Sequence, residues 1–554
     1  MTMKKVYVWL IFVVSVIVSL YFGFQKSGFH EDEYYTYFSS NRTMGLYQPD
    51  RQWQDRQTIL DEFSVKKGEG FNYGLVKLVQ SWDVHPPLYY WIFHTICSLT
   101  PGVFTKWSGL IANLIAFCLA FWLLYRILEE LETPLVVEVL TLAFYGLNPQ
   151  TISCNMLIRM YAWLTAAVFA CALVHICFIK KMKNANRFNF ETEVGKKSDS
   201  KGISREAVLA FAAAWGPIVL VSYLGFLIQY FYLYFWAGIG AFTFLWLCFS
   251  RFDFKRAFIY AGSNVLALGL AVLTYPSSVR HMFGGYRGSE AAGGLFDLGN
   301  TWMRVSFFIG LLNDFVFGKC LLIVITLILM GTLYLNLRRS REVATGHKQR
   351  YQSPRPEILA LVVATAVYFL LTAKTALLVG AASNRYEMPV YGLIGFIIIW
   401  DVYMVFTRIE DYGKGNRNRS FVMIIMVFFA VLILKSLVVD DNVLFLYKED
   451  TEKIAYAANH SGEVAVVMYN PATPQNVWRL TDELLQYDRV FYMDEENLEP
   501  LTEAEITGAS EITLYAADDP MQIEAFGNLL DSCPGISTMA PLFVEDMWSS
   551  YVLK

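Results

Sequence analysis

The sequence predicts a polytopic all-α membrane protein that ends in a small α/β domain. The chain of 554 residues is 55% hydrophobic and only 17% charged, whereas soluble domains carry roughly 25% charged residues. Its apolar residues form blocks long enough to cross a hydrocarbon core of about 30 Å, and clusters of Lys and Arg separate these blocks. Residues 440–554 lack such blocks and are rich in acidic residues.

The apolar blocks predict about 11 membrane spans, or about 13 if the long blocks are broken helices. The first block, Val6–Phe24, follows the basic start MTMKK. It is longer than the apolar core of a signal peptide and no small-residue cleavage site follows, so we expect an uncleaved span. The further expected spans are Trp107–Tyr125, Met156–Ile179, two within Ala207–Phe249, Ala257–Tyr275, Phe315–Leu335, Ile358–Val379, Val390–Phe406 and Phe421–Val439.

Three apolar segments compete for two crossings between His85 and Met156. They are Pro86–Leu99, Trp107–Tyr125 and Pro134–Asn148. The first and the third are short for a full crossing. We therefore expect one of them to be re-entrant or interfacial, which requires that protein bury its backbone.

Charge predicts the sidedness of the loops, because Lys- and Arg-rich loops stay in the cytoplasm. Four such loops occupy residues 180–201, 251–256, 337–355 and 407–419. The outer segments are then residues 25–85, 276–303, 381–389 and everything after about Val439. The prediction is a multi-pass protein of the cell membrane with a cytoplasmic N-terminus and an extracytoplasmic C-terminal domain.

The C-terminal domain, residues 440–554, alternates strand-like and helix-like patterns, which is typical of an α/β layer domain. The expected strands are Val464–Tyr469, Val490–Met493 and Ile512–Ala516, and the expected helices are Lys453–Asn459, Asn476–Leu485 and Met521–Leu530. Cys533 is the one cysteine of this domain, so no internal disulfide is expected. No Gly-rich phosphate loop opens any of its helices, so we predict no nucleotide site.

Carboxylates cluster shortly after the first span, in Phe29-His30-Glu31-Asp32-Glu33-Tyr34. Adjacent carboxylates repel one another, and this repulsion together with partial burial raises the proton affinity of at least one of them. A carboxylate tuned in this way can take a proton from a hydroxyl group. The alternative is a solvated flank of a helix end.

A rigid corner is expected in Trp82-Asp83-Val84-His85-Pro86-Pro87. Two prolines fix the direction of the chain as it re-enters the membrane. They would hold Asp83 and His85 at the interface. The alternative is a helix start with Asp83 as N-cap and proline in the first turn, which explains the prolines but not His85.

Two Arg–Tyr pairs lie at outer ends of spans. Arg159 and Tyr161 belong to Ile158-Arg159-Met160-Tyr161-Ala162-Trp163, and Arg385 and Tyr386 belong to Ser383-Asn384-Arg385-Tyr386-Glu387-Met388-Pro389. An Arg inside an apolar span needs an anionic partner or reaches outward to water, and each Arg alone is typical of such an anchor. Guanidinium groups also bind phosphate through paired hydrogen bonds.

The outer loop of residues 276–303 contains GGYRGSEAAGG together with Arg280, His281 and Arg287. Its glycines permit large backbone motion, so the loop could serve as a lid over a site. The alternative is a plain unstructured loop.

In their order along the chain, these motifs resemble those of the GT-C glycosyltransferases. The motifs are Asp32-Glu33 after the first span, Asp83-x-His85-Pro86-Pro87-Leu88-Tyr89-Tyr90, Arg159-Met160-Tyr161, and Arg385-Tyr386 ahead of Pro389. Within the superfamily the chain resembles the bacterial protein O-mannosyltransferase and aminoarabinose-transferase branch (glycosyltransferase family 39), over roughly Val6–Val439. It departs from that pattern in the apolar Met156–Ile158, where many relatives carry an acidic residue, and in the additional acid Glu31.

The resemblance implies an inverting transferase that moves a sugar from a polyprenyl-phosphate donor to an acceptor hydroxyl on the outer face of the membrane. Asp32 would be the catalytic base and Glu33 its neighbour. The residues implied in donor or phosphate binding are His85, Arg159, Tyr161, Arg385 and Tyr386, and the further candidates are Glu31, Asp83 and Arg287. The acceptor would be a protein, a lipid or a wall glycan, and no nucleic-acid partner is expected.

A metal is not expected, because relatives in the mannosyltransferase branch are not thought to need one. If one were bound, Asp32, Glu33, Asp83 and His85 would offer the hard ligands that suit Mg²⁺ or Mn²⁺. The rival functions are a secondary transporter, a ligase or flippase of lipid-linked glycans, and a scaffold for the C-terminal domain. Transporters hold ionisable groups near the bilayer midplane, often within repeats, whereas here the candidate groups cluster at one predicted face.

Overall fold

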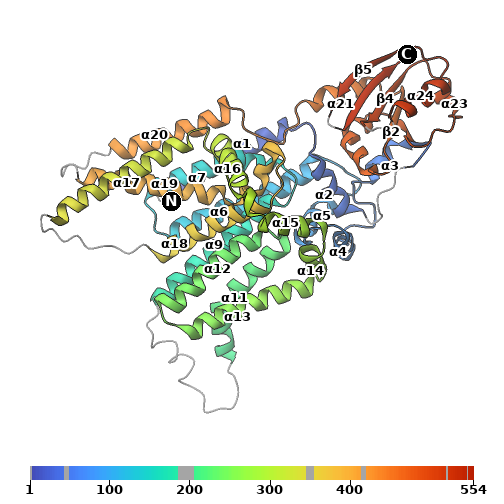
Figure 1. The fold of residues 1–554 in the computed structure, drawn as a ribbon. Helices are drawn as coiled ribbons and strands as arrows, with labels where there is room; N and C mark the ends of the chain where they lie inside the picture. Colours follow the sequence, from blue (N-terminus) through green and yellow to red (C-terminus); the bar gives the residue numbers. More distant parts are fainter. Residues whose placement is uncertain are drawn as a thin grey trace. The chain divides into compact units, whose positions relative to one another are not determined.

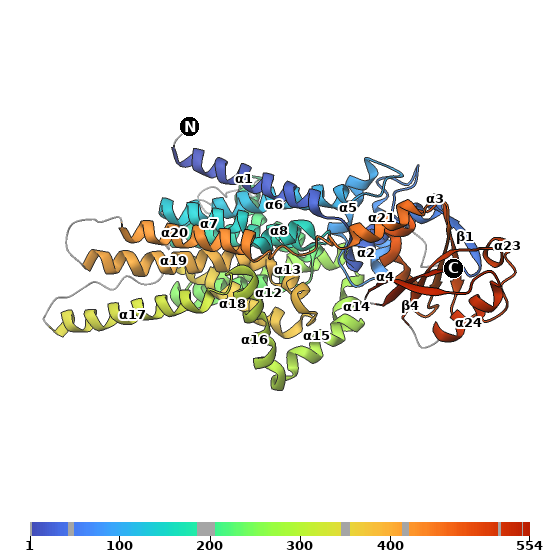
Figure 2. The same cartoon turned by 90° about the horizontal axis from the view of Figure 1, so that it is seen from above.

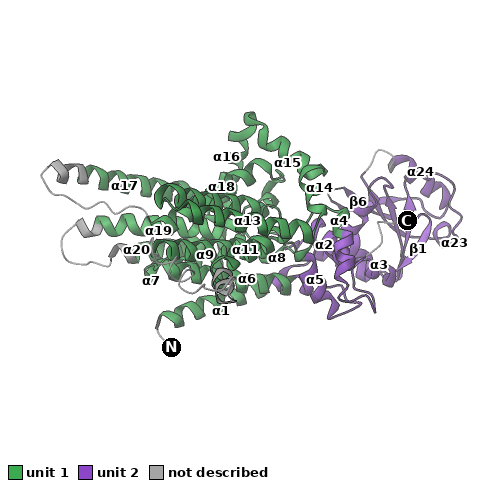
Figure 3. Cartoon of the chain, turned by 90° about the horizontal axis from the view of Figure 1, so that it is seen from below, with its two compact units in different colours: residues 1–22, 80–89, 110–444 green, residues 23–79, 90–109, 445–554 purple. Residues whose placement is uncertain are grey.

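The computed structural model describes residues 3–42, 49–184, 205–344, 355–412, 420–518, 522–545 and 547–554. They form two compact units (Figure 3). Unit 1 comprises residues 1–22, 80–89 and 110–444, and unit 2 comprises residues 23–79, 90–109 and 445–554. Unit 1 is helical and unit 2 contains a sheet (Figure 1). The predicted fold class, an all-α membrane part with a small α/β domain, is confirmed.

The long helices of unit 1 lie side by side (Figures 1 and 2). They are α1 (Met3–Gln25), α6 (Lys106–Glu130), α7 (Leu135–Leu147), α8 (Pro149–Met156), α9 (Tyr161–Asn184), α11 (Arg205–Ile228), α12 (Tyr232–Leu245), α13 (Phe254–Thr274), α17 (Leu321–Ala344), α18 (Pro356–Thr375), α19 (Met388–Tyr412) and α20 (Ser420–Leu434). Shorter pieces are the π-helical turns η1 (Trp246–Ser250), η3 (Leu312–Val316) and η5 (Lys435–Val439).

Small residues let the helices of unit 1 approach closely. A Cβ atom on Gly395 of α19 would lie 2.5 Å from the Phe144 ring of α7, and one on Gly392 would lie 2.9 Å from the Phe169 ring of α9. In a membrane, helices associate through such close van der Waals packing rather than through the hydrophobic effect. Glycine at these positions therefore lets α19 pack closely against α7 and α9.

Eight helical stretches in the described residues are long and apolar enough to cross a membrane. They are α1, α6, α9, α12 with η1, α13, α17, α18 and α19. Two shorter apolar stretches, 213–228 and 423–439, coincide with further predicted spans. The chain is thus a multi-pass membrane protein, while the predicted total stays a prediction. The predicted cytoplasmic loops fall largely on residues 185–204, 345–354 and 413–419, which lie outside the described residues.

The structure distinguishes the three segments that compete for two membrane crossings, which are Pro86–Leu99, Trp107–Tyr125 and Pro134–Asn148. Helix α5 (Leu88–Ser98) has only 11 residues, whereas α6 has 25. Helices α7 and α8 together pass the test for a span but bend by 44° at Asn148, as a broken span or a re-entrant loop does. By length, α6 is a crossing and α5 is too short, while the bent α7–α8 pair fits a broken span as well as a re-entrant segment.

One prediction about local structure in unit 1 is wrong, and one alternative is ruled out. The span expected at Met156–Ile179 begins only at Tyr161, because α8 ends at Met156 and residues 157–160 are not helical. The outer loop is not unstructured, since it forms α14 (Ser277–Phe283), α15 (Tyr286–Phe296), the 3₁₀ turn η2 (Leu298–Asn300) and the start of α16 (Thr301–Leu311). Its role as a lid stays a prediction.

The sheet of unit 2 has six strands in the order β1-β3-β2-β4-β6-β5. Its strands are β1 (Gln52–Asp55), β2 (Val464–Tyr469), β3 (Arg489–Asp494), β4 (Ile512–Ala517), β5 (Met539–Val544) and β6 (Trp548–Leu553). The central strands β3, β2 and β4 run parallel, while β1, β6 and β5 pair antiparallel. Parallel strands are buried on both faces, which explains the continuous apolar runs that predicted these three strands correctly.

Apolar clusters cover both faces of this sheet. Val467, Tyr487 and Trp548 belong to the cluster on one face, and Val466, Phe491 and Leu529 to the cluster on the other. The helical elements of the C-terminal part are α21 (Asp450–Asn459), the 3₁₀ turn η6 (Pro474–Leu480), α22 (Thr481–Leu484), α23 (Ala504–Thr507) and α24 (Gln522–Ser532). From earlier in the chain, unit 2 includes α2 (Glu31–Asn41), α3 (Arg56–Asp61) and most of α4 (Tyr73–Trp82).

Candidate functional site

Three of the four sequence motifs meet within unit 1. A guanidinium nitrogen of Arg159 lies 2.9 Å from Nε2 of His85. The rings of Tyr161 and Tyr386 make an edge-to-face contact with their centroids 5.9 Å apart. Residues far apart in the sequence, at positions 85, 159–161 and 385–386, therefore form one cluster, which we call the Arg–His cluster (His85, Arg159, Tyr161, Arg385 and Tyr386).

A break between two helices positions Arg159. Helix α8 ends at Met156, and residues 157–160 connect it to α9. Interrupting a helix inside a membrane frees backbone carbonyls, which must find other donors. The side-chain amide of Asn113 donates to the carbonyls of Leu157 at 2.6 Å and Asn155 at 3.2 Å. Arg159 is only 5% exposed, so it does not act as the outward-reaching anchor that was the alternative reading.

The contact between Arg159 and His85 sets the tautomer of the imidazole. Arginine has donors only, so the Nε2 atom of His85 must accept and the hydrogen of a neutral ring must sit on Nδ1. Pro86 and Pro87 are buried between the end of α4 and the start of α5, and residues 83–87 are not helical. Because proline fixes its own φ angle, the two prolines restrict the backbone next to His85.

A 3₁₀ turn, η4 (Gly380–Tyr386), positions Arg385. Its guanidinium carbon lies 5.0 Å from the centroid of the Tyr386 ring, and one guanidinium nitrogen lies 3.1 Å from the Tyr386 hydroxyl. The Tyr368 hydroxyl donates to the backbone carbonyl of Tyr386 at 2.8 Å, and the Tyr391 hydroxyl donates to the Asn384 side chain at 2.8 Å. Arg385 is 6% exposed, so this second guanidinium is also buried and held rigidly.

Glu387 was quoted in the motif but not predicted as a site residue. It is fully buried, and neither of its carboxylate oxygens has a hydrogen-bond partner among the described residues. An ionised carboxylate in such a place is costly, so Glu387 is expected to carry a proton. In the sequence, the one indication of a role for Glu387 is its position two residues after Arg385.

Asp83, a further candidate, lies near Tyr230 and His281. The Tyr230 hydroxyl lies 3.2 Å from Nδ1 of His281. Burial lowers the pKa of His281, and the nearby Asp83 carboxylate opposes that shift. Burial also raises the pKa of Tyr230, to which the charge of Asp83 adds. Sequence reasoning missed Tyr230, which could have been noticed only as a polar interruption between two apolar blocks.

Arg287, the remaining candidate of unit 1, lies on α15 and pairs with Glu290 at 2.9 Å, and about half of each side chain is exposed. No hydrogen bond joins it to the Arg–His cluster among the described residues. Arg280 and His281 of the preceding helix instead approach the backbone carbonyl of Ser81, His281 at 3.3 Å. These contacts tie the predicted lid to the segment that leads into Asp83.

Unit 2 carries the acidic motif, at the start of α2. His30 caps this helix, since its Nδ1 accepts the amide hydrogen of Asp32 at 3.1 Å. The carboxylate of Glu33 accepts the amide hydrogen of His30 at 2.5 Å and pairs with Lys26 at 2.9 Å. Nδ1 of His30 also lies 3.6 Å from the Asp32 carboxylate.

The three neighbouring carboxylates have different surroundings. Glu33 is fully buried with Lys26, and Glu31 pairs with Arg479. The side chain of Asp32 is 31% exposed at the first turn of α2. The expected mutual repulsion is therefore relieved by separate partners. Asp32 keeps the most suitable surroundings for a base, while its role and that of Glu33 stay predictions.

The C-terminal domain packs on the helix that carries Asp32. The Trp478 ring contacts the rings of Tyr35 and Phe38 of α2 at centroid distances of 5.1 and 4.6 Å. The Tyr34 hydroxyl donates to Asp482 at 3.2 Å. The segment of η6 and α22 thus fixes one side of α2, which no sequence pattern indicated.

No group of three or more His, Cys, Asp or Glu side chains within the described ranges is placed to hold a metal ion. The residues named for a metal divide between the units, Asp32 and Glu33 in unit 2 and Asp83 and His85 in unit 1. Whether the reaction needs a metal stays a prediction.

No protein-family model and no curated protein matches this chain. Among solved structures it is similar to ArnT from Cupriavidus metallidurans, at 12% identity and a TM-score of 0.43, covering 98% of this chain and 97% of that one. It is also similar to the Archaeoglobus fulgidus oligosaccharyltransferase AglB in complex with an inhibitory peptide and a dolichol-phosphate, at 11% identity and a TM-score of 0.47, covering 97% and 72%. A structure of the A. fulgidus oligosaccharyltransferase tethered to an acceptor peptide matches at 11% identity and a TM-score of 0.42, covering 99% and 74%.

Proposed function

We propose that this protein is a membrane glycosyltransferase that moves a sugar from a polyprenyl-phosphate donor to an acceptor hydroxyl, with inversion at the anomeric carbon. The observation that supports it best is the Arg–His cluster, in which contacts among three distant motifs link two buried guanidinium groups and an imidazole within unit 1. Since the solved structures above have TM-scores below 0.5, the proposed function rests on residues of this chain and on the resemblance of its motifs.

The Arg–His cluster suits the donor phosphate. Guanidinium groups bind phosphate oxygens through pairs of short hydrogen bonds, and in a buried place such bonds are stronger than in water. As the glycosyl–phosphate bond breaks, negative charge grows on the departing lipid phosphate. Arg159 and Arg385 are fixed before the reaction by the helix break and by η4, so they can stabilise that charge without rearranging.

His85 adds a proton-dependent group to the cluster. In the resting arrangement it accepts from Arg159. A phosphate that takes over this Arg159 hydrogen bond would free Nε2, and a protonated imidazole would then be a second donor to the phosphate. A phosphate is already a good leaving group, so no general acid is required at the anomeric carbon, unlike the paired carboxylates of glycoside hydrolases.

Asp32 is the proposed base. Its carboxylate, in the first turn of α2, is 31% exposed, so a substrate hydroxyl can reach it. An ionised, partly exposed carboxylate can remove the proton of the acceptor hydroxyl as that oxygen attacks the anomeric carbon. Glu33 is unsuited to this step because it is buried in an ion pair with Lys26.

The test is sugar transfer by the purified full chain from a panel of radiolabelled polyprenyl-phosphate sugars. Asp32→Asn should lower the rate by a factor of about 10² to 10⁴, the usual contribution of general-base catalysis. Asp488→Asn, at an exposed position of the same unit, is the matched control and should transfer as the wild type does. Unchanged transfer by Asp32→Asn would remove Asp32 as the base, and no transfer from any donor by the wild type would reject the proposed function.

A further inference from the structure

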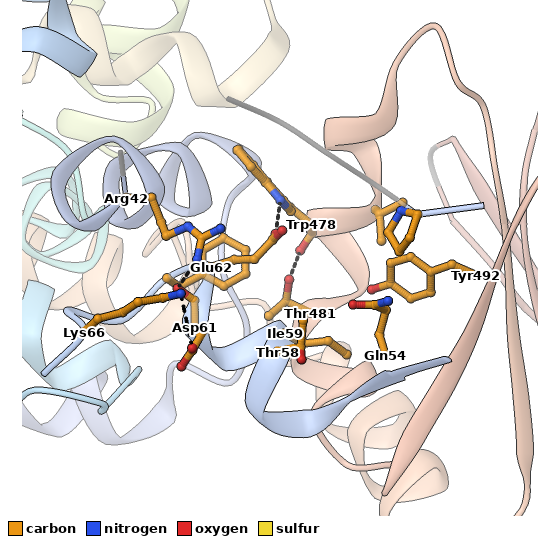
Figure 4. A pocket seen from close by; sticks show the side chains of 13 residues that line it. Arg42, Gln54, Thr58, Ile59, Asp61, Glu62, Lys66, Trp478, Thr481 and Tyr492 are labelled. Carbon is orange, nitrogen blue, oxygen red and sulfur yellow. Dashed lines mark hydrogen bonds and ion pairs between the residues drawn. The ribbon is translucent and has the colours of Figure 1, made fainter. Parts of the chain in front are cut away.

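Unit 2 contains a cavity of about 470 Å³ that no sequence motif indicated (Figure 4). Its walls come from two distant parts of the chain, Arg42 with residues 49–66 after α2, and residues 477–492 of the C-terminal domain. The volume lies within the range of about 300–1,000 Å³ that is usual for sites of small ligands. The cavity is therefore large enough for a specific small ligand.

Planar polar groups and aromatic rings line this cavity together. The polar groups include the carboxylates of Asp61 and Glu62, the guanidinium of Arg42 and the amide of Gln54, and the rings include those of Trp478 and Tyr492. Figure 4 shows these side chains around the hollow. Carboxylate, amide and guanidinium groups each offer two hydrogen-bonding atoms in one plane. Such pairs match the adjacent hydroxyl groups of a sugar ring, and aromatic rings suit its C–H faces.

The hydrogen bonds that the lining side chains already make do not use all of their hydrogen-bonding atoms. Trp478 donates to one oxygen of Glu62 at 2.8 Å, and Arg42 donates to the backbone carbonyl of Asp61 at 3.2 Å. The buried Nε of Arg42 has no hydrogen-bond partner among the described residues. The other carboxylate oxygen of Glu62 can accept a hydrogen bond from a ligand hydroxyl.

Charge argues against an ionic ligand. The lining contains two carboxylates and two cations, Arg42 and Lys66, and the Lys66 amine lies 3.4 Å from the Asp61 carboxylate. The charges of the walls therefore balance, so neither a phosphate nor a polycation would be favoured.

The cavity also adjoins the helix that carries Asp32. Its wall residue Trp478 packs on Tyr35 and Phe38 of α2, and Arg42 is the residue that directly follows this helix. We propose that the cavity binds a neutral saccharide and presents it as the sugar acceptor. This inference rests on the proposed function, which it deepens by naming the class of acceptor.

The test is the binding of neutral di- and trisaccharides of glucose, galactose, mannose and N-acetylglucosamine to the purified full chain, by saturation-transfer NMR and calorimetry. At least one saccharide should bind, and Gln54→Ala and Asp61→Asn should each weaken it about tenfold, the loss of one good hydrogen bond. Gln52→Ala is the matched control, because it makes the same change on the same strand outside the cavity lining. Thermal unfolding of each variant separates lost binding from lost folding.

Three results would overturn the proposal. These are binding of no saccharide in the panel, equal weakening by Gln52→Ala and the two cavity variants, or cavity-dependent binding of a Ser/Thr peptide or of inorganic phosphate instead. Binding is measured without any donor, so it does not depend on transfer. Saccharide binding without transfer would count against the transferase alone, and transfer without saccharide binding would count against the cavity alone.

Discussion

At the scale of single residues, the charged side chains named by the motifs have defined partners. Arg159 contacts His85, Glu33 contacts Lys26, and Glu31 contacts Arg479. Buried charge is tolerated only when it is paired and hydrogen-bonded. The pairing distinguishes the three carboxylates of the acidic motif, which the sequence alone could not do.

The raised pKa of Asp482 predicts that the stability of unit 2 depends on pH. Burial raises its pKa to about 7, with Asp450 and Glu33 adding to the shift and Tyr34 and Lys26 opposing it. In the unfolded chain an Asp titrates near pH 4. Between about pH 4 and 7 the folded unit therefore keeps a proton that the unfolded chain has released. The free energy of unfolding falls with rising pH across this window, by up to about 1.4 kcal/mol per pH unit.

Hydrogen exchange of the sheet amides of unit 2 at pH 5 and pH 8 checks this prediction. Exchange, corrected for its intrinsic pH dependence, should report lower stability at pH 8. Asp482→Asn removes the titrating group, so it should stabilise unit 2 at pH 8 and flatten the dependence. Burial also raises the pKa of Glu483, to about 8, so part of the slope should remain. An unchanged slope in Asp482→Asn would show that Asp482 does not carry this effect.

At the scale of elements, the residues of the Arg–His cluster lie where helices are interrupted. Arg159 lies in the break between α8 and α9, His85 in the corner between α4 and α5, and Arg385 in the 3₁₀ turn η4. Irregular backbone within a membrane protein is tolerated where protein buries it or where it lines a cavity. Interrupted helices also direct polar groups at a ligand in other membrane proteins. The positions of the interruptions thus support a binding role for the cluster.

The ion pair between Arg479 of η6 and Glu31 of α2 predicts that η6 contributes to the stability of α2. This ion pair is partly exposed, with 23% of the Arg479 and 38% of the Glu31 side chain accessible. Such pairs contribute up to about 1 kcal/mol. Arg479→Ala should therefore increase hydrogen exchange of the α2 amides by up to about fivefold, and the exchange of β4 should not change.

A charge swap provides the control for this element. The double variant Glu31→Arg with Arg479→Glu restores opposite charges at the two positions, so it should recover part of the lost protection of α2. If the double variant exchanged faster than both single variants, the ion pair would not be what anchors the helix.

At the scale of the whole molecule, the sequence predicted the elements with strong periodicity. Apolar blocks and the runs at Val464–Tyr469 and Ile512–Ala516 led to the correct elements, because burial dictates those residues. Strand β1 was missed because its sequence, Gln-Trp-Gln-Asp, is short and mostly polar, and β5 because its residues are largely exposed and include Pro541. The start of α9 was misplaced because Leu157 and Ile158 are apolar yet not helical.

The candidate site was predictable only in part. The motifs named His85, Arg159, Tyr161, Arg385 and Tyr386, and their spacing could not show that they meet, since tertiary packing of α9 and α19 brings them together. Glu387, Tyr230 and the cavity lined by Gln54 and Trp478 had no local signal. The cavity is formed by two segments more than four hundred positions apart in the sequence. Neither segment alone contains a pattern that predicts their contact.

The proposed mechanism requires that the base and the phosphate-binding groups act on the same sugar. Asp32 belongs to unit 2, whereas His85, Arg159 and Arg385 belong to unit 1. Reacting groups must come within about 3–3.5 Å of the atoms they act on, so the proposed mechanism predicts that Asp32 can reach a sugar whose phosphate is bound at the Arg–His cluster. In a chain whose native cysteines are replaced by serine, Asp32→Cys with His85→Cys should be cross-linked by a short bifunctional thiol reagent.

The pair Arg159→Cys with His85→Cys is the positive control, because these two side chains are in contact within unit 1. Each single cysteine variant reports background reaction. Bound polyprenyl phosphate should increase the yield for positions 32 and 85, since a donor held by the cluster would favour the arrangement in which the reaction occurs. If the control pair is cross-linked and the pair at 32 and 85 is not, with or without the lipid, Asp32 cannot be the base for a sugar bound at Arg159. The acidic motif would then serve only to cap α2 and to pair with Lys26 and Arg479.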